Sequence, residues 1–403
     1  MTPNRPTTIL CLASYFKGTT VLEACRDEGC HVILVTREKL ADMPWPAAAI
    51  DERFLMPNLS AEPDIFHAIS YLGRSRHIDR IIALDDYDVL TAAAVREHTR
   101  IPGMGQTTAR RFRDKLAMRY RAQERGLLVP EFVPILNYED IGEFIKRIRP
   151  PWVLKPRTEA GAMGIKLIGS PEELWEWLNR LGDEQSYFLL EEYIPGDVYH
   201  VDSVVWEEKV LFAEPNKYWQ PPIHVAHEGG VFVTRTLDRN SKEARGLLSM
   251  NKKLLKALGM VRGVAHTEYI RSHEDGRLYF LETAARVGGA NIAEFVEAAT
   301  GVNLWREWAR LEIAEARQQS YELPQTRQDY AGILICLARQ QFPDMSAYQE
   351  PEVVWRLEGK ENHAGLIVVA DSPERIEELL EQYNRRFAAD FLAVAPPLDK
   401  PPQ

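Results

Sequence analysis

The hydrophobic and polar residues of the first hundred positions form short blocks of two kinds. The apolar runs TILCLA, CHVILVT and DRIIAL are continuous, as is typical of strands buried on both faces. Helical periodicity fills the intervals around 18–29, 63–72 and 87–98. This alternation predicts a parallel sheet with helices on its faces, the architecture of an α/β domain.

The turn after the first apolar run tests whether this domain binds a dinucleotide. It reads SYFKGTTVLEA, with one glycine, Gly18, and no GxGxxG. The domain is therefore expected to have an architectural or substrate-side role. Asp85 and Asp86, near the end of the third run, are candidate ligands, but capping of the following helix explains them equally well.

The stretch WVLKPRTEAGAMGIKLIGS predicts a hairpin that suits a polyphosphate. Strands over 152–155 and 165–168 flank a loop whose small residues let backbone amides approach a ligand, namely Gly161, Ala162 and Gly164. Lys155, at the end of the first strand, can supply charge to phosphate oxygens. The loop is not a P-loop, because a strand and not a helix follows it, and a small glycine hairpin without a ligand is the alternative.

Two adjacent carboxylates close the next strand. Helices are predicted over 109–126, with basic residues on a solvated face, and over 171–182, before the strand SYFLLEEYIPG at 186–196. Glu191 and Glu192 end its apolar part, so at least one faces the interior or a cleft. A buried carboxylate needs a donor, which is either an adenine amino group or a local Arg or Lys.

Residues 266–289, HTEYIRSHEDGRLYFLETAARVGG, predict a hairpin with two acidic residues inside it. If the turn is the three-residue Glu274-Asp275-Gly276, Glu268 lies directly opposite Glu282. Like charges so placed destabilise a sheet unless something compensates. A hard divalent cation does so, and Mg²⁺ favours one or two carboxylates with waters and phosphates. The alternative is a surface hairpin with one glutamate paired to an Arg or His.

A cation and backbone amides follow this hairpin directly. Arg286 stands four residues after Glu282, and Gly288 and Gly289 lead into a predicted helix over 291–299. A helix N-terminus preceded by glycines is a ready anion site. The sequence therefore predicts that metal, guanidinium and amide donors converge within a few residues.

Composition narrows the class of partners and the compartment. The 403 residues carry 49 Lys and Arg against 59 Asp and Glu, a net charge of -10, which argues against nucleic acid as a partner. Four cysteines without metal-ligand spacing fit a reducing cytoplasm. No apolar run reaches the length of a membrane span, so no membrane association is expected. The Pro-rich end, 395–402, is expected to be a frayed tail.

The ordered motifs resemble the ATP-grasp superfamily of carboxylate-amine ligases, and the form HTE with E-x-A-A-R is similar to bacterial L-amino acid ligases. The motifs are RDKLAMR, VLKP, EAGAMG, EEYI, HTE and LETAAR. The resemblance spans about 10–390 and implies an ATP-grasp fold of mixed α/β and α+β class. It implies an N-terminal parallel-sheet domain over 1–113, a small ATP-lid subdomain over 114–196, a central catalytic subdomain over 197–320 and a C-terminal α+β cap over 321–403.

The same resemblance implies roles for individual residues. ATP and Mg²⁺, with Mn²⁺ as an alternative, are the implied cofactors. Lys115 and Lys155 would contact the phosphates of ATP, and the loop residues Glu159, Gly161, Ala162 and Gly164 would cover them. The adenine would be bordered by Glu191, Glu192, Tyr193 and Ile194. Glu268 and Glu282 would bind the metal, and Arg286 would bind the acyl-phosphate or the tetrahedral intermediate that follows it.

The sequence departs from the family pattern at two positions. Ala284 stands where many ATP-grasp enzymes have an Asn that binds metal, which leaves a third protein ligand unassigned. Val198 replaces an acidic residue, which leaves Asp197 or Asp202 as open choices for a ribose or substrate contact.

The implied activity is activation of a carboxylate, an L-amino acid, as an acyl-phosphate and its coupling to an amine. A ligase of a non-proteinogenic carboxylate in natural-product biosynthesis and a non-catalytic nucleotide-binding protein are the alternatives. A homodimer suits such an enzyme, but no sequence feature decides it. The loop 216–230, with Tyr218, Trp219, His224 and His227, is either pocket lining or a mixture of core aromatics and exposed histidines.

Overall fold

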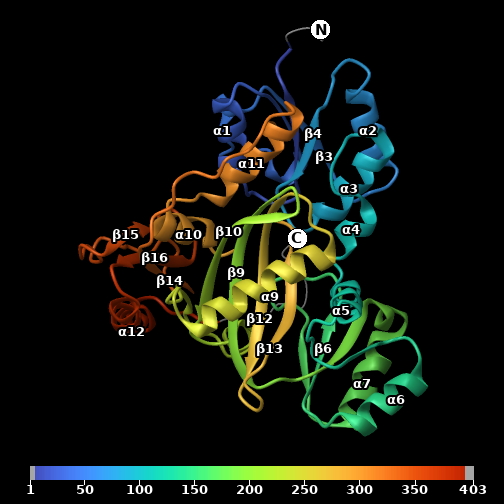
Figure 1. Cartoon of the computed structure of the whole chain (residues 1–403), viewed down its shortest axis with the longest axis vertical. Helices are drawn as coiled ribbons and strands as arrows, with labels where there is room; N and C mark the ends of the chain where they lie inside the picture. The colour runs from blue at the N-terminus through green and yellow to red at the C-terminus, as the bar shows by residue number, and fades with distance from the viewer. Residues whose placement is uncertain (1–4, 395–403) are drawn as a thin grey trace.

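A computed structural model describes residues 5–394, apart from the side chains of Ala226 and His227. Its described part contains a parallel four-stranded sheet, an antiparallel four-stranded sheet and an eight-stranded antiparallel sheet (Figure 1). The blue N-terminal sheet lies at the top of the figure, the green lid sheet at the lower right and the large sheet between them. The predicted mixture of α/β and α+β architecture is confirmed, and the predicted frayed tail lies outside the described residues.

The N-terminal sheet has the strand order β3-β2-β1-β4, and every pairing in it is parallel. Its strands are β1 (Thr8–Ala13), β2 (His31–Arg37), β3 (Glu52–Met56) and β4 (Arg80–Ala83). The three predicted strands are confirmed. Strand β3 was not predicted, because two of its five residues are charged and none is fully buried, as suits an edge strand.

Helices cover both faces of this sheet, as the apolar runs require. They are α1 (Thr19–Asp27), α2 (Asp64–Leu72) and α3 (Asp88–Thr99), with short 3₁₀ helices η1 (Glu38–Leu40) and η2 (Ala47–Ala49) before β3. One face packs on α2 and α3. The other face packs on α1, and α11 (Leu304–Ala316), from far along the chain, lies against α1 (Figure 1). The N-terminal domain is thereby fixed to the rest of the molecule.

The predicted helix over 109–126 is two helices, α4 (Gln106–Arg110) and α5 (Lys115–Glu124). The break has a local cause, because Asp114 adopts an extended conformation and its carboxylate accepts from the Leu116 and Ala117 amides, as an N-cap does. Starting the helix at this point places Lys115 in its first turn.

The lid is a small antiparallel sheet of order β5-β8-β6-β7. Its strands are β5 (Phe132–Pro134), β6 (Trp152–Pro156), β7 (Lys166–Ile168) and β8 (Phe188–Glu192), covered by α6 (Tyr138–Arg147) and α7 (Pro171–Leu181), with η3 (Gly182–Tyr187) before β8. The predicted hairpin of β6 and β7 is confirmed. The strand predicted over 186–196 ends at Glu192, and Tyr193, Ile194 and Pro195 link the lid to the next strand.

The eight-stranded sheet has the order β13-β12-β9-β10-β11-β14-β16-β15. Its strands are β9 (Gly196–Trp206), β10 (Lys209–Tyr218), β11 (Phe232–Thr236), β12 (Gly263–Ser272), β13 (Leu278–Ala284), β14 (Tyr330–Leu337), β15 (Val353–Arg356) and β16 (His363–Ala370). The C-terminal strands continue this sheet, because β14 pairs with β11.

Helices flank the large sheet. They are α8 (Pro222–Glu228), α9 (Lys242–Leu258), α10 (Ile292–Thr300), α11 and α12 (Pro373–Asp390). The yellow helix α9 lies across one face in Figure 1, while α10 and α11 contribute to the core on the other. The predicted helix over 291–299 is confirmed as α10, and Gly301 caps its C-terminus with a left-handed φ of 78°. No helix within residues 5–394 is both long and apolar enough to cross a bilayer.

The β12–β13 hairpin pairs Glu268 with Glu282, as predicted, but the predicted turn is wrong. Near the turn Arg271 pairs with Leu278, and the Ser272 amide donates to the Arg277 carbonyl, so four residues and not three form the loop. The register then shifts by one residue between the Glu268 and Tyr269 pairs. This bulge, where Leu281 is the extra residue, restores the pairing that the shorter turn would have given.

Candidate active site

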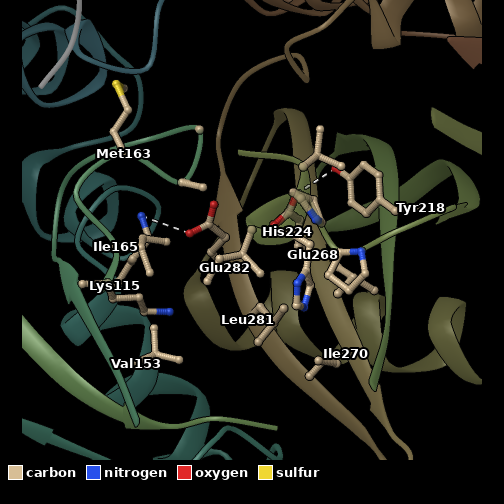
Figure 2. A pocket seen from close by; sticks show the side chains of 18 of the residues that line it. Lys115, Val153, Met163, Ile165, Tyr218, His224, Glu268, Ile270, Leu281 and Glu282 are labelled. Atoms are coloured by element: carbon tan, nitrogen blue, oxygen red, sulfur yellow. Dashed lines mark hydrogen bonds and ion pairs between the residues drawn. The ribbon is translucent and has the colours of Figure 1, made fainter. Parts of the chain in front are cut away.

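A cavity of about 460 Å³ lies between the lid and the central sheet. Volumes of roughly 300–1,000 Å³ are usual for ligand pockets. Figure 2 shows side chains from the two walls pointing toward one another across it. Every residue with a predicted site role lines it except Gly164: Lys115, Lys155, Glu159, Gly161, Ala162, Glu191, Glu192, Tyr193, Ile194, Glu268, Glu282 and Arg286.

The two glutamates of the hairpin share one side of the cavity. The Tyr218 hydroxyl donates to Oε1 of Glu268 at 2.7 Å, and the Lys115 ammonium lies 3.0 Å from Oε2 of Glu282 (Figure 2). Each carboxylate thus keeps one oxygen that accepts no hydrogen bond within residues 5–394, Oε2 of Glu268 and Oε1 of Glu282. Oxygen ligands of this kind suit a hard divalent cation.

The charges and burial in the cavity determine the protonation states of Glu282 and Tyr218. Burial would raise the pKa of Glu282, but Lys115 and Lys155 outweigh that effect and lower the pKa to about 2. Burial and the Glu268 carboxylate raise the pKa of Tyr218, so its hydroxyl stays a donor. Glu282 is therefore ionised at neutral pH.

The wall formed by the lid contains a buried network of charges. Glu191 lies 2.6 Å from Lys155 and 2.6 Å from Arg119, whose side chain has no exposed surface. Burial works to raise the pKa of Glu191, and the two cations outweigh it and hold that pKa below its usual range. Burial lowers the pKa of Lys155 to about 8, although the Glu191 charge opposes the change. Of the two predicted kinds of donor to Glu191, the structure provides the local cations.

The link between lid and central sheet reaches the far side of the cavity. The Tyr193 hydroxyl lies 3.4 Å from Nε2 of His224 on α8, and both residues line the cavity. Of the aromatic residues in the predicted lining loop, Tyr218 is buried at the cavity and Trp219 is exposed. The side chain of His227 lies outside the described residues.

Arg286 enters the cavity from the turn after β13. Its Nη1 donates to the Val287 carbonyl at 2.8 Å, and its Nε lies 3.7 Å from Oδ1 of Asp86, which belongs to the N-terminal domain. Asp86 also pairs with Arg113 at 3.2 Å. Neither Oδ1 of Asp86 nor Nε of Arg286 has a hydrogen-bond partner within residues 5–394, so the two buried atoms face each other.

The loop after β6 is tied to two neighbouring elements. The Lys115 ammonium donates to the Glu159 carbonyl at 2.5 Å, and the Tyr87 hydroxyl donates to Oε2 of Glu159 at 2.8 Å. Gly161 and Ala162 have φ values of 67° and 61°, and only the first is free of the strain a side chain brings there. The loop therefore lies over the cavity in contact with the N-terminal domain.

The remaining acidic candidates lie elsewhere. Asp85 pairs with Lys17 at 2.6 Å, and its Oδ1 accepts from the Tyr87 amide. This bond, just before α3, is of the kind expected for capping by Asp85, whereas the nominal N-cap, Tyr87, makes no side-chain cap and Asp86 pairs with Arg113 instead. Asp197 pairs with Lys217 at 2.9 Å, and Asp202 has no exposed surface. Neither lines the cavity.

Sequence reasoning missed Arg119 and the contact of Asp86 with Arg286. Arg119 follows Lys115 by four residues on α5, so both lie on one helix face, and this spacing is readable from the sequence. The approach of Asp86 to Arg286 depends on the docking of two domains, which no local pattern predicts.

Residues 148–294 match the model of the ATP-grasp domain. An L-arginine-specific L-amino acid ligase from Bacillus subtilis is 27% identical over 242 residues, which cover 58% of this chain and 58% of that protein. An alanine–anticapsin ligase from Bacillus subtilis (strain 168) is 23% identical over 268 residues, which cover 60% of this chain and 56% of that protein. The matches thus span less than two thirds of the length of these curated relatives.

A crystal structure of an L-amino acid ligase from Bacillus licheniformis has the same fold. It superimposes with a TM-score of 0.77 at 19% identity, covering 97% of this chain and 99% of that chain. The chain therefore carries an ATP-grasp domain in an ATP-grasp fold, and the resemblance read from the motifs is confirmed.

Proposed function

We propose that this chain, built around its ATP-grasp domain, is an ATP-dependent ligase that activates the carboxylate of an L-amino acid as an acyl-phosphate and couples it to an amine. One observation carries the proposal: Glu268 and Glu282 lie directly opposite each other in a cavity that Lys115, Lys155 and Arg286 also line. Paired carboxylates with several cations in one cavity suit a nucleotide polyphosphate and its metal.

The first step overcomes the poor reactivity of a carboxylate. A carboxylate oxygen attacks the γ-phosphorus of ATP, the bond from that phosphorus to the bridging oxygen breaks, and ADP leaves. Lys115 and Lys155 bind the phosphate oxygens, and Arg286 neutralises charge on the transferred group. Positioning and charge stabilisation account for most of the catalysis of such a transfer.

The second oxygens of Glu268 and Glu282 fit a divalent cation, because no described residue donates a hydrogen bond to them. Mg²⁺, with Mn²⁺ as the alternative, would neutralise charge on the phosphate oxygens when bound. The pKa of Glu282, held at about 2, keeps this ligand ionised.

The second step forms the amide. The amine attacks the acyl carbon, the bond from that carbon to the phosphate oxygen breaks, and phosphate leaves while the amine loses a proton. Arg286 is placed to stabilise the oxyanion of the tetrahedral intermediate. We assign no residue as the base that accepts the proton.

A related substrate class has its own support. The alanine–anticapsin ligase among the relatives is named for one encoded amino acid, alanine, and for one compound outside the encoded twenty. The cavity also has an apolar section beside α8, with Pro222, Ile223, Val225 and Phe232. A ligase of the same chemistry that acts on a non-proteinogenic carboxylate is therefore the second candidate.

The test is phosphate release from ATP and Mg²⁺ with each of the twenty amino acids, alone and in pairs, and mass analysis of the products. We expect release with particular pairs and an amide of the summed mass less water. Glu282→Gln should lower the rate at least about 100-fold through lost metal binding. Glu274→Gln, the same charge change in the exposed turn of that hairpin, is the matched control and should retain the rate. Nucleotide binding without release across the panel would contradict the proposal.

A further inference from the structure

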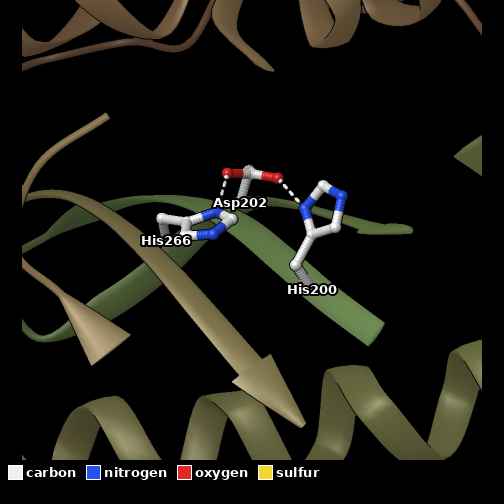
Figure 3. Close-up of side chains that lie close together, drawn as sticks. All are labelled: His200, Asp202 and His266. Carbon is white, nitrogen blue, oxygen red and sulfur yellow. Dashed lines mark hydrogen bonds and ion pairs between the residues drawn. The ribbon is translucent and has the colours of Figure 1, made fainter. Parts of the chain in front are cut away.

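Three ionisable side chains lie close together in the eight-stranded sheet: His200, Asp202 and His266 (Figure 3). His200 and Asp202 are on β9 and His266 is on β12. The strand register sets His266 opposite Asp202 and Glu268 opposite His200. Since alternate residues of a strand share a face, all four side chains project from the same side of the sheet.

Asp202 holds both imidazole rings. Its Oδ2 accepts from Nδ1 of His200 at 2.7 Å, and its Oδ1 accepts from Nδ1 of His266 at 2.9 Å (Figure 3). Nε2 of His200 lies 2.8 Å from the Thr234 hydroxyl on β11, which anchors the far end. His200 and Asp202 have no exposed surface and His266 is 9% exposed, so these three residues reach the cavity only through His266.

Two side chains connect this group to one oxygen of Glu268, namely His266 and Tyr218. Nε2 of His266 lies 3.6 Å from Oε1 of Glu268, and the Tyr218 hydroxyl donates to the same Oε1. The Tyr218 ring packs at 4.7 Å, between ring centroids, on the ring of His200. Both groups that contact Oε1 therefore contact His200 or Asp202 in turn, whereas Oε2 makes no hydrogen bond within residues 5–394.

A contribution to folding stability does not explain why three ionisable side chains are buried at this position. Removing a carboxylate and two imidazoles from water is costly, and replacing buried ionic groups by apolar ones of similar volume is often neutral or stabilising. Hydrogen bonds to Thr234 and Asn216 offset part of this cost, but the cores on the two faces of the sheet are built from apolar residues. A requirement for Glu268 in one orientation explains why ionisable residues occupy these positions.

We infer that Asp202 is a positioning residue for the metal site: with His200 it fixes His266 and Tyr218, which together orient Glu268 so that one oxygen faces the cation. The inference rests on the proposed metal site at Glu268 and Glu282. Residues that orient metal ligands typically contribute about 10-fold to 100-fold to metal affinity.

A metal ion bound by His200, Asp202 and His266 themselves is the competing account, because their ligand atoms lie within 4.8 Å of one another. The hydrogen bonds disfavour it. Each oxygen of Asp202 already accepts a hydrogen bond from a ring nitrogen, and Nδ2 of Asn216 donates to Oδ2 as well, so an ion would have to displace these hydrogen bonds.

The test measures Mn²⁺ binding in the presence of a non-hydrolysable ATP analogue, by electron paramagnetic resonance, with wild-type protein and Asp202→Asn. We expect the Kd for Mn²⁺ to rise about 10-fold to 100-fold, and metal-free nucleotide affinity to stay within threefold. Ser203→Ala is the matched control. It breaks a buried 2.8 Å hydrogen bond to Asn251 from the next residue of β9, and it should leave the Kd for Mn²⁺ unchanged.

The other possible outcomes contradict the positioning role of Asp202, the metal site or the ligase function, as follows. Equal Mn²⁺ affinity in folded Asp202→Asn overturns the inference, as does stoichiometric zinc in wild-type protein that this variant loses. A wild-type protein that binds no Mn²⁺ removes the metal site and the inference with it, whereas Mn²⁺ binding without ligase turnover contradicts only the proposed function. If Asp202→Asn does not fold, Tyr218→Phe tests the other connecting side chain, since it deletes only the hydroxyl, and unchanged Mn²⁺ affinity would overturn the inference.

Discussion

In the cavity, the lysines that would bind phosphate form ion pairs with glutamates. Lys115 neutralises Glu282 and Lys155 neutralises Glu191, so the cations that would meet phosphate are held by carboxylates in the ligand-free protein. A bound metal ion would take over the role of Lys115 beside Glu282 and release its ammonium for a phosphate oxygen. Exchange of partners thus prevents any of these charges from being buried alone.

The depressed pKa of Lys155 gives a prediction at this scale. Below pH 8 its side chain is charged, and above pH 8 the free protein holds it neutral, because burial lowers its pKa to about 8. Phosphate binding favours the charged form. Nucleotide affinity should therefore be constant from pH 6.5 to 7.5 and then decrease, with a slope that approaches a tenfold loss of affinity per pH unit above pH 8. Calorimetric titration with an ATP analogue from pH 6.5 to 9.5 measures this.

The matching variant is Lys155→Met. It should bind nucleotide weakly at every pH, and its plot of affinity against pH should show no change of slope near pH 8, because the titrating ammonium is absent. Arg119 still neutralises Glu191 in this variant. A wild-type profile without a change of slope, or a change of slope that survives in Lys155→Met, would show that another group controls nucleotide affinity.

At the scale of elements, the bulge in β13 decides which residues meet. The four-residue loop alone would set Glu268 opposite Leu281, and the bulge at Leu281 places Glu282 there instead. Nearly continuous apolar runs predicted the hairpin, and an assumed three-residue turn predicted the facing pair. The turn length was wrong and the bulge was not predicted, because an apolar Leu at the bulge fits the pattern in either register.

The same contrast holds for the other elements. Continuous apolar runs made β1, β2 and β4 readable, whereas the charged edge strand β3 lacked such a signal. Many of the predicted lining residues lie in glycine-containing loops or near strand ends, where motifs are informative. Arg119, Asp86 and the His200, Asp202 and His266 group become important only through tertiary contacts.

Gly196, where the chain leaves the lid for β9, gives a prediction on packing. A Cβ at this position would lie 2.3 Å from the Arg271 carbonyl oxygen on the neighbouring strand. Gly196→Ala should therefore destabilise the fold by about 1–3 kcal/mol, seen as a lower Tm. Gly142→Ala, in helix α6 with no atom within 4 Å of its Cβ, is the matched control and should raise stability by about 0.5–1 kcal/mol. An equal Tm for both variants would contradict the close strand approach.

At the scale of the whole molecule, the cavity depends on segments that lie far apart in the sequence. The N-terminal domain contributes Asp86 to Arg286 and Tyr87 to the loop at Glu159, and α11 packs on α1 to hold that domain in place. The lid and the central sheet provide the opposing walls. The N-terminal sheet thus has a role in the site although it lacks a dinucleotide motif.

Asp86→Asn tests this role. The variant loses the charge that faces Nε of Arg286, and a misplaced Arg286 should lower kcat about 10-fold to 100-fold with the KM for ATP within threefold. Asp79→Asn, which disrupts the ion pair to Arg5 at the other end of the same domain, should retain kcat. Equal kcat values for both variants would mean that the N-terminal domain does not act through Arg286.

The most direct test of the central claim follows an oxygen atom. The protein is incubated with ATP, Mg²⁺ and a mixture of the twenty amino acids labelled with ¹⁸O in their carboxylates, and the released phosphate is analysed by mass. Attack of a carboxylate on the γ-phosphate predicts one ¹⁸O in each phosphate released, with ADP as the other product and no label when Glu282→Gln replaces wild type. Unlabelled phosphate, or ¹⁸O recovered in AMP, would contradict an acyl-phosphate route in this cavity.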